Sequence, residues 1–406
     1  MDTLITFLGR APRTEAGYRT TRYRFADGSE SAPVAFFGWA LRECLRPEKM
    51  VVLGTAGSMW DHLFEQDINL GVACEEERMQ LMEAVAQQNV SAALLSRLAP
   101  LLAKHLGIEI ELQLIPYCRS EHEQLELLGI MAGQVSQGSN VHLDITHGFR
   151  HLPMLALMSA MHLRIVKRAS IAGIWYGAFD PDTQSAPVHD LAGLLRIADG
   201  LVALAQFDKD GDYRVFARTL EHAGVPQPVI ESLTRAGYYE NILNVGAATG
   251  ELRRVRQQLQ NIEGIDTALL LPAVRERLAW IDEDRQFEKQ LRLAQHGIEQ
   301  GDYLRATLYA YESVITRLCQ LRRVPVEDFD AREAVRKDYE GRLQRDSIEQ
   351  KRYKLLKNLR NQIAHGTRGS TQEVQQALLN EATMLNALTE VMNAIKSGQL
   401  PGAWFN

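Results

Sequence analysis

The first half of the chain alternates short runs of β-branched and other apolar residues with longer stretches whose apolar residues recur at helical spacing. The strand-like runs are residues 2–9, 49–54, 109–116, 141–146 and 169–177, and the helix-like stretches are 33–44, 75–107, 120–138 and 151–166. Parallel strands need long crossover connections, so this alternation predicts a mostly parallel, Rossmann-like sheet with helices on both faces. Alternating Tyr and Arg at residues 18–25 predict an additional hairpin strand.

From about residue 191 the strand pattern stops and helical patterns continue to the end. Residues 191–285 contain helical pieces separated by turn signals, which predict a helical connector. Residues 286–406 contain one helical stretch after another with short connections, which predict an antiparallel helical bundle. We therefore expect an α/β domain at 1–190 followed by these two all-α parts. From Arg285 onward 19 Lys and Arg stand against 15 Asp and Glu, so a polyanion is expected to prefer the bundle.

The composition excludes several classes of protein. A chain of 406 residues with 46% hydrophobic and 24% charged residues is typical of a folded globular protein. No stretch approaches the roughly 20 apolar residues of a membrane span, and the N-terminal sequence has no cleavable signal pattern, so we expect a cytoplasmic protein with no membrane contact. The four cysteines form no CxxC pair, which argues against a disulfide framework and a structural zinc site, and we expect no metal.

Glycines and polar residues follow two of the predicted strands, within residues 52–61 and 141–155. Because the carboxyl ends of parallel strands meet at one sheet edge, beside helix N-termini with unpaired amides, these loops predict a cradle for a phosphate or a nucleotide. The candidate residues are Gly54, Thr55, Ala56, Gly57, Ser58, Trp60, Asp144, Thr146, His147, Gly148 and Arg150. A single such turn would be a buried, hydrogen-bonded corner, but two on one edge favour a ligand site. Trp60 either stacks on a ligand base or packs in the core.

The stretch from Asp144 to Arg150 resembles the D-x-T-H-G-x-R signature of CARF domains, the CRISPR-associated Rossmann-fold sensors of cyclic oligoadenylates. Residues 52–61 resemble the companion loop of these domains. The first loop, FLGRAPR, departs from the pattern, in which threonine often follows the glycine. The resemblance implies that Gly9 and Arg10 belong to the binding site, with Arg10 or Arg13 serving phosphate. It also implies an allosteric activator in place of a cofactor, with cyclic tetra-adenylate favoured over the hexa-adenylate.

A second group of polar residues lies near the end of the predicted helix at 347–366. His365 shares a face with Asn361, whereas Arg360 lies about 140° around the helix from His365. The arginine and histidine therefore converge only if the helix end turns the histidine inward, or if a second copy packs across a two-fold axis. Ordinary helix-end chemistry is the alternative, because Gly366 stands where a C-cap glycine belongs and a histidine in the last turn interacts favourably with the helix dipole.

RNQIAH, residues 360–365, resembles the R-x(4–6)-H motif of HEPN domains, small helical bundles that often act as metal-independent ribonucleases. A polar residue directly after the arginine, here Asn361, is typical of the nuclease-type members. The resemblance implies that Arg360 holds and neutralises the scissile phosphate while His365 assists proton transfer as the 2'-hydroxyl of the RNA attacks. Asn361 would orient the phosphate or the histidine.

Three further residues of the bundle are assigned roles on the same basis. Lys354 and Lys357, on the motif helix, would attract the RNA backbone independently of its sequence. Glu312, on a facing helix, would support the histidine or the arginine. The expected products carry 2',3'-cyclic phosphate and 5'-hydroxyl ends.

The order of the parts resembles the CARF-HEPN ancillary ribonucleases of type III CRISPR antiviral systems over essentially the whole chain. The resemblance implies a homodimer or a higher homo-oligomer that binds one cyclic oligoadenylate across its two-fold axis and cuts single-stranded RNA when the ring is bound. Three alternatives stay open: a sensor with a non-catalytic HEPN module, a ring nuclease that cuts its own activator, and a nucleotide-dependent dehydrogenase. The dehydrogenase ranks last because the chain lacks a GxGxxG turn followed by an acidic ribose-binding residue.

Overall fold

The computed structural model describes residues 1–15, 17–65, 74–148, 151–222, 224–259, 265–366, 371–402 and 404. The chain divides into two compact units, Met1–Arg196 and Ile197–Asn406. The first unit contains a β-sheet with helices, and the second is helical in its described residues, so the predicted α/β half followed by an all-α half is confirmed. The predicted connector and bundle belong to one unit and share one hydrophobic core.

The first unit is built on a seven-stranded sheet of order β4-β9-β8-β7-β1-β5-β6. The five predicted strands form its larger part: β1 (Asp2–Leu8), β5 (Lys49–Gly54), β6 (Glu109–Leu114), β7 (Asn140–Asp144) and β8 (Ser170–Gly177). Every described pairing in this sheet is parallel except that of β8 with β9 (Ser185–Asp190), which the sequence pattern did not predict. The predicted strand at 18–25 is interrupted: its first residue, Tyr18, ends β3 (Gly17–Tyr18), and only Arg22–Arg24 form the short edge strand β4. β3 pairs with β2 (Arg13–Thr14) in a separate two-stranded sheet.

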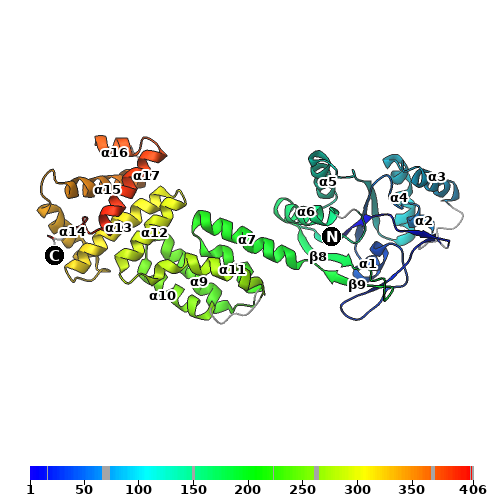
Figure 1. The fold of residues 1–406 in the computed structure, drawn as a ribbon, viewed down its shortest axis with the longest axis horizontal. Coiled ribbons are helices and arrows are strands. Elements are labelled where there is room, and N and C mark those ends of the chain that lie inside the picture. The colour runs from blue at the N-terminus through cyan, green and yellow to red at the C-terminus, as the bar shows by residue number, and fades with distance from the viewer. Residues whose placement is uncertain are drawn as a thin grey trace. The chain divides into compact units, whose positions relative to one another are not determined.

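Successive strand side chains enter two different cores, because side chains alternate across a β-strand. Leu4 and Val52 belong to one cluster of buried residues, and Ile5 and Val51 belong to another. The first cluster includes residues of α1 (Phe37–Leu45), α2 (His62–Glu65), α3 (Glu75–Ala86) and α4 (Ala92–Leu106). The second includes residues of α5 (Glu121–Gly133) and α6 (Leu152–Val166). Helices therefore cover both faces of the sheet, as predicted (Figure 1).

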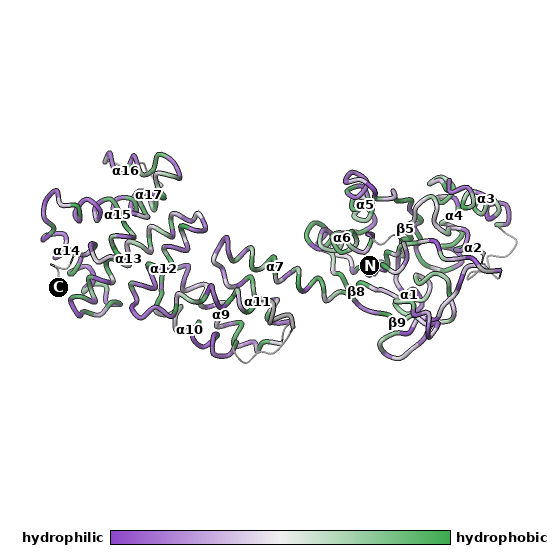
Figure 2. Tube along the Cα trace, in the orientation of Figure 1, coloured by the Kyte–Doolittle hydropathy of each residue, from purple (hydrophilic) through white to green (hydrophobic). Residues whose placement is uncertain are grey.

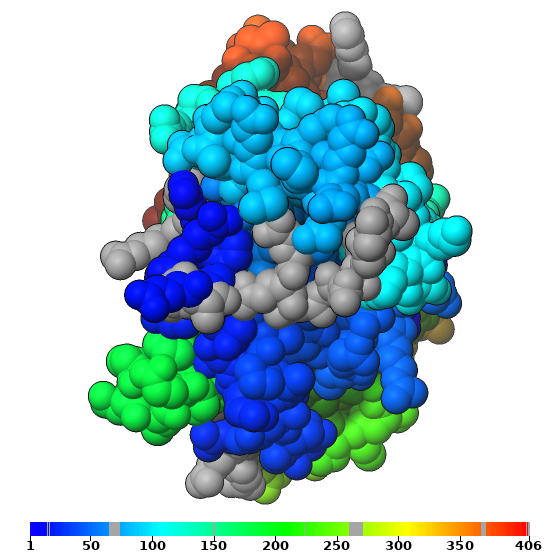
Figure 3. All heavy atoms as spheres, turned by 90° about the vertical axis from the view of Figure 1, so that its right-hand side faces the viewer, coloured from blue at the N-terminus to red at the C-terminus, as the bar shows by residue number. Residues whose placement is uncertain are grey.

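The single helix predicted at 75–107 is wrong: the structure breaks it into α3 and α4. Gln88 has a φ of 55°, a left-handed conformation that an α-helix cannot contain. Ser91 then starts α4 afresh, because its side chain accepts a hydrogen bond from the Leu94 amide. The two helices appear in sky-blue on the face of the unit seen in Figure 3.

The second unit is a succession of helices. They are α7 (Gly193–Asp210), which starts in the first unit, η2 (Tyr213–Phe216), α8 (Ala217–His222), α9 (Gln227–Asn241), α10 (Val245–Leu259), α11 (Ile265–Arg277), η3 (Ala279–Asp282), α12 (Gln286–Glu299), α13 (Tyr303–Leu321), α14 (Phe329–Arg342), α15 (Ile348–His365), α16 (Gln372–Ala377) and α17 (Glu381–Lys396). The last helical stretch is divided into α16 and α17, because Asn380 caps a new helix by accepting a hydrogen bond from the Thr383 amide. α14 is mostly hydrophilic along its length (Figure 2).

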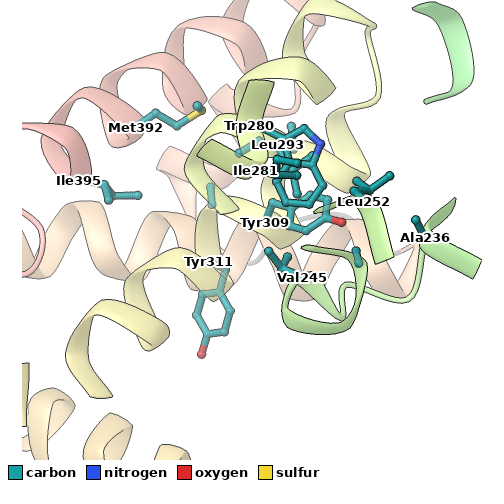
Figure 4. Packing of buried hydrophobic residues seen from close by; sticks show 14 of the residues in the cluster. Ala236, Val245, Leu252, Trp280, Ile281, Leu293, Tyr309, Tyr311, Met392 and Ile395 are labelled. Atoms are coloured by element: carbon teal, nitrogen blue, oxygen red, sulfur yellow. The ribbon is translucent and has the colours of Figure 1, made fainter. Parts of the chain in front are cut away.

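The core of this unit forms around α13. Tyr309 is fully buried on one side of the helix, beside Trp280 and Leu293, while the Tyr311 ring points to another side (Figure 4). The cysteines of the whole chain are all free thiols, of which Cys74, Cys118 and Cys319 are buried and Cys44 is exposed.

Candidate ligand cavity and candidate nuclease site

A cavity of about 350 Å³ opens where the carboxyl ends of four parallel strands meet. The chain continues from β1 toward β5 and from the neighbouring strand β7 toward β8, on the other side. Open α/β sheets bind ligands at such a reversal of strand order. The cavity is lined by Leu8, Gly9, Arg10, Leu53, Thr55, Gly57, Ser58, Gln88, Ile115, Tyr117, Arg119, Gly148 and Leu152. The structure therefore brings six predicted residues together: Gly9, Arg10, Thr55, Gly57, Ser58 and Gly148.

The loop after β5 is closed by its own hydrogen bonds. The Thr55 amide donates to Ser58 Oγ at 3.0 Å, and the Ser58 amide donates to the Thr55 carbonyl at 3.0 Å. Trp60 Nε1 donates to the same carbonyl at 2.8 Å, and the Trp60 ring is fully buried. A Cβ on Gly54 would lie 2.6 Å from this ring, so glycine is required there. Of the two roles considered for Trp60, the structure favours packing beneath the loop.

The turn after β7 is held by three side chains of the predicted site. Asp144 accepts hydrogen bonds from Thr6 Oγ1 at 2.5 Å and from the Thr146 amide at 2.8 Å. Thr146 Oγ1 accepts from the Gly177 amide at 2.9 Å, and His147 Nε2 accepts from the Phe37 amide at 3.1 Å. These side chains tie the turn to β1, β8 and α1, and they are not among the residues that line the cavity.

Two of these groups have shifted pKa values because they are buried. Burial raises the pKa of Asp144 to about 6, although the donors on Thr6 and Thr146 act in the opposite direction. Burial, with a smaller contribution from the nearby His62, lowers the pKa of His147 to about 4. A neutral imidazole has one nitrogen able to accept, which agrees with the hydrogen bond that His147 accepts from a backbone amide.

The loops after β1 and β7 touch through their glycines. A Cβ on Gly9 would lie 2.7 Å from the Gly148 amide nitrogen, and Gly148 has a φ of 114°, which favours glycine. Leu152, the first residue of α6, also lines the cavity, so the N-terminal end of that helix adjoins it. Few amides of its first turn are available to a ligand, because Pro153 has none and the Met154 and Leu155 amides both donate to the His151 carbonyl.

Two further predicted residues are absent from the lining, and a third is not described. Ala56 is half-buried in the loop and does not line the cavity. Arg13 forms an ion pair with the buried Asp61, which also accepts a hydrogen bond from Tyr18 Oη at 2.8 Å, so Arg13 is engaged away from any phosphate. Arg150 lies outside the described residues.

Sequence reasoning missed three polar residues of the cavity: Gln88, Tyr117 and Arg119. Tyr117 and Arg119 follow β6 at the same sheet edge, so the rule that selected the loops after β5 and β7 would also have found them. The Arg119 guanidinium lies 4.8 Å from the centre of the Tyr117 ring. Gln88 had no such signal, because it lies at a helix break that the pattern does not reveal.

A second cavity, of about 400 Å³, lies among α13, α14 and α15. Its lining is Tyr311, Glu312, Ile315, Phe329, Arg332, Glu333, Arg336, Lys357, Arg360 and Asn361. Four of these side chains are cationic and two are anionic, so the lining is basic on balance. The structure therefore places Arg360, Asn361 and Lys357 of the predicted nuclease site in one cavity.

Two neighbouring side chains contact the guanidinium of Arg360. Its guanidinium lies 5.5 Å from the centre of the Tyr311 ring, and its Nη1 donates to Asn361 Oδ1 at 3.0 Å. Its Nε is buried and has no hydrogen-bond partner among the described residues. A buried donor without a partner is costly, and it is a group that an incoming phosphate oxygen would satisfy.

The other residues predicted for this site are placed as follows. Lys357 donates to Glu340 at 2.7 Å, while Lys354 is exposed. Glu312 accepts a hydrogen bond from Arg332 at 2.5 Å. Its partner is therefore an arginine that was not among the residues predicted for this site.

His365 is the last residue of α15, exposed, and absent from the lining of the second cavity. Gly366 ends the helix with a φ of 65°, which confirms the predicted glycine C-cap. A single described chain therefore does not bring His365 and Arg360 into one cavity.

In the described parts of the chain, no group of three or more His, Cys, Asp or Glu side chains could hold a metal ion. Within the same residues, no helix has the length and apolar character needed to cross a membrane.

Comparisons with known proteins bear mainly on the first unit. Residues 3–180 match the family model described as the CARF domain of the CRISPR system endoribonuclease Csx1. The CRISPR-associated protein MJ1674 of Methanocaldococcus jannaschii is 25% identical over an alignment of 413 residues. The alignment covers 95% of this chain and 63% of that protein. The chain thus spans less than two thirds of the length of this relative. Together these matches support a CRISPR-associated protein with a CARF-type domain at its N-terminus.

One solved structure aligns over most of the chain. Enterococcus italicus Csm6, bound to cyclic hexa-2'-fluoro-hexa-dAMP, aligns over 97% of this chain and 94% of its own, at 9% identity and a TM-score of 0.38. A likeness of this size is too low to carry an argument about the arrangement or the activity of this chain.

Proposed function

We propose that this protein is a cyclic-oligoadenylate-activated, metal-independent endoribonuclease that cuts single-stranded RNA in type III CRISPR antiviral defence. The CARF match of residues 3–180 supports the sensor part, and the cavity at the strand ends supplies the site. Arg10 and Arg119 give that cavity two cations, which suits a ligand with several phosphates.

The observation that carries the nuclease part is the position of Arg360. Its buried Nε has no partner among the described residues, and it shares a basic cavity with Asn361, Lys357, Arg332 and Arg336. Arg360 would hold the scissile phosphate through its guanidinium, and the lysine and arginines would attract the neighbouring phosphates. Stabilising negative charge on the phosphate in this way lowers the barrier to attack.

The chemistry follows from these groups. The 2'-hydroxyl oxygen of the substrate attacks the adjacent phosphorus, the bond from phosphorus to the 5'-oxygen breaks, and a 2',3'-cyclic phosphate and a 5'-hydroxyl result. His365 assists the proton transfers. Because His365 does not line the Arg360 cavity of its own chain, we propose that a homodimer completes the site, and that the ring biases the dimer toward this arrangement.

The test is cleavage of a fluorogenic single-stranded RNA in EDTA, with and without cyclic tetra-adenylate or cyclic hexa-adenylate. Wild type is expected to cut only when one ring is present, and His365→Ala and Arg360→Ala are expected to lose at least about 100-fold in rate. His222→Ala is the matched control, because His222 is also exposed at the last residue of a helix, α8, and should leave the rate unchanged.

Three outcomes would change the proposal. Ring binding without RNA cleavage would leave a sensor whose helical unit has no catalytic role. Loss of the ring itself during incubation, abolished by changes in the first cavity and not by His365→Ala, would identify a ring nuclease. Absence of ring binding would remove the sensor function as well.

A further inference from the structure

Three separate segments of the first unit meet at one spot of the ligand cavity. They are the loop after β5, which contributes Gly57, the turn between α3 and α4, which contributes Gln88, and the segment after β6, which contributes Tyr117. A Cβ on Gly57 would lie 3.2 Å from Tyr117 Oη and 3.6 Å from both Cγ and Cδ of Gln88. The absence of a side chain at residue 57 therefore leaves space beside the Gln88 amide and the Tyr117 hydroxyl.

The end of α3 fixes the backbone of Gln88 at this spot. Its φ of 55° is left-handed, which costs a residue with a Cβ about 1–2 kcal/mol. The turn is fixed on both sides, because the backbone amide of Gln88 donates to the Val85 carbonyl at 3.1 Å and Ser91 caps the helix that follows. This is the ordinary end of a helix in a Schellman motif, in which the Asn89 amide also donates to the Ala84 carbonyl at 2.9 Å, and it fixes the point from which the Gln88 side chain extends.

The side chain of Gln88 is available for a ligand. Gln88 is exposed, and no hydrogen bond in the described part of the chain engages its side-chain amide. The adjacent Gln87 differs: its Nε2 donates to Glu83 at 3.1 Å and its Oε1 accepts from Asn89 at 3.1 Å. Gln88 thus presents both a donor and an acceptor to the cavity, whereas the amide of Gln87 is already satisfied.

The other polar groups of the lining are less suited to recognising a base. Ser58 Oγ already accepts from the Thr55 amide, and the hydroxyls of Thr55 and Ser58 lie 3.3 Å apart, within hydrogen-bonding distance of each other. Arg10 and Arg119 carry only donors, which match phosphate oxygens. Among the described lining residues, Gln88 alone carries a primary amide.

We propose that Gln88 is the residue that distinguishes adenine from other bases in the cyclic oligoadenylate. Its Oε1 accepts from the adenine N6 amino group and its Nε2 donates to adenine N7, the paired contact that amide side chains make with adenine. This inference rests on the proposed function, since it assumes that the cavity holds the ring. It adds the source of base specificity, which phosphate contacts cannot provide.

The experiment compares, by isothermal titration calorimetry, the binding of cyclic tetra-adenylate and cyclic tetra-inosinate to the full-length protein. Hypoxanthine replaces the N6 amino group by a carbonyl acceptor, which would face Gln88 Oε1. Wild type is expected to prefer the adenylate ring by at least about tenfold, and Gln88→Ala is expected to reduce the preference to about threefold or less. If the six-membered ring is the one that binds, the hexa-adenylate and hexa-inosinate pair takes their place.

Two further variants make the result specific. Gln87→Ala removes a neighbouring exposed glutamine whose amide is engaged elsewhere, and it should keep the full preference. Gln88→Gly removes the side chain while accommodating the positive φ, so a lost preference in this variant does not come from misfolding.

The outcomes separate the inference from the proposed function. If wild type binds an adenylate ring and Gln88→Ala retains the full preference for it, Gln88 does not read the base and the inference fails alone. An equal loss of affinity for both rings would also overturn it, because Gln88 would then act without regard to the base. If wild type binds neither adenylate ring, the sensor function fails and the inference fails with it.

Discussion

Trp60 packs against the loop that follows β5 and supports its backbone. Its ring is fully buried, and its single polar atom donates to the Thr55 carbonyl at 2.8 Å. The same carbonyl also accepts a hydrogen bond from the Ser58 amide. The turn from Thr55 to Ser58 is therefore stabilised by two hydrogen bonds to one oxygen. A change at Trp60 therefore acts on the cavity without touching a ligand.

Trp60→Phe is expected to destabilise the first unit by about 1–3 kcal/mol, because it removes one donor from a buried carbonyl and leaves most of the ring in place. Urea unfolding measures the loss. Trp404→Phe is the control: Trp404 Nε1 also donates to an acceptor, Glu349, but the tryptophan is 48% exposed, so water replaces the lost bond and the change should stay within about 0.5 kcal/mol. Equal effects of the two variants would contradict the role given to Trp60.

The buried Asp144 makes stability depend on pH. Burial raises its pKa to about 6 from about 3.9 in the unfolded chain, so the protonated form is favoured by folding. This contribution is fully present below about pH 4 and is lost as the pH rises through about 6. From pH 4 to 7, wild type is therefore expected to lose up to about 3 kcal/mol relative to Asp144→Asn. Urea unfolding of both proteins at the two pH values measures the difference, and a constant difference would contradict the shift.

At the scale of elements, the loops after β1 and β7 are in backbone contact. The parallel pairing of the two strands sets them side by side, and Gly9 and Gly148 let the loops approach closely. Both glycines line the candidate ligand cavity. The spacing of these loops is therefore set by two residues that contribute no side chain.

Gly9→Ala is expected to weaken binding of the cyclic tetra-adenylate or hexa-adenylate ring by about tenfold or more, since the new Cβ would lie 2.7 Å from a backbone nitrogen and the loops would have to separate. Calorimetric titration measures the loss. Gly129→Ala, on α5 with nothing within 4 Å of its Cβ, is the matched control and should leave affinity unchanged. Unaltered ring affinity in Gly9→Ala would show that the loops do not form the site.

Elements with a strong local pattern could be predicted, and those that depend on distant partners could not. The β5 strand is a continuous apolar run, and all but its first residue are buried. β9 contains a proline and polar residues, and it is a strand only because β4 and β8 lie on either side of it. The break between α3 and α4 depends on one left-handed residue, Gln88, in a stretch of helix-forming residues.

The same distinction applies to the candidate sites. Thr55, Ser58 and Gly148 could be predicted, because they lie in loops that follow strands whose ends must share an edge, whereas Gly9 was implied by the family resemblance. Asp144 was found as part of the same motif, but only the structure shows that its contacts are to Thr6 and Thr146, beneath the cavity. Arg332 and Arg336 could not be assigned, because arginines on a hydrophilic helix such as α14 give no sign of which face meets α15.

At the scale of the whole molecule, the described core residues divide at the unit boundary. The two clusters of the first unit use residues up to Leu195, and the cluster of the second begins at Ala203. Separate cores allow the units to differ in stability. A ligand of the first unit then stabilises that unit directly and the second only through coupling.

A cyclic tetra-adenylate or hexa-adenylate ring at about 100 times its Kd is expected to stabilise the first unit by about 2.7 kcal/mol. Hydrogen–deuterium exchange with mass spectrometry should show slower exchange in β1, β5 and β7 than in the ring-free protein. The helices α9 and α10 should change less. Protection confined to the second unit would contradict a ligand site in the first.

The exposure of Cys44 has a practical consequence. Because the other three cysteines are buried, a maleimide dye should attach to the native sequence at one position in each chain. Partial burial raises the pKa of the Cys44 thiol, so labelling should proceed faster in mildly alkaline buffer. A mixture of donor-labelled and acceptor-labelled chains would then report, by energy transfer, how two copies assemble and whether a ring changes their separation, with no engineered cysteine.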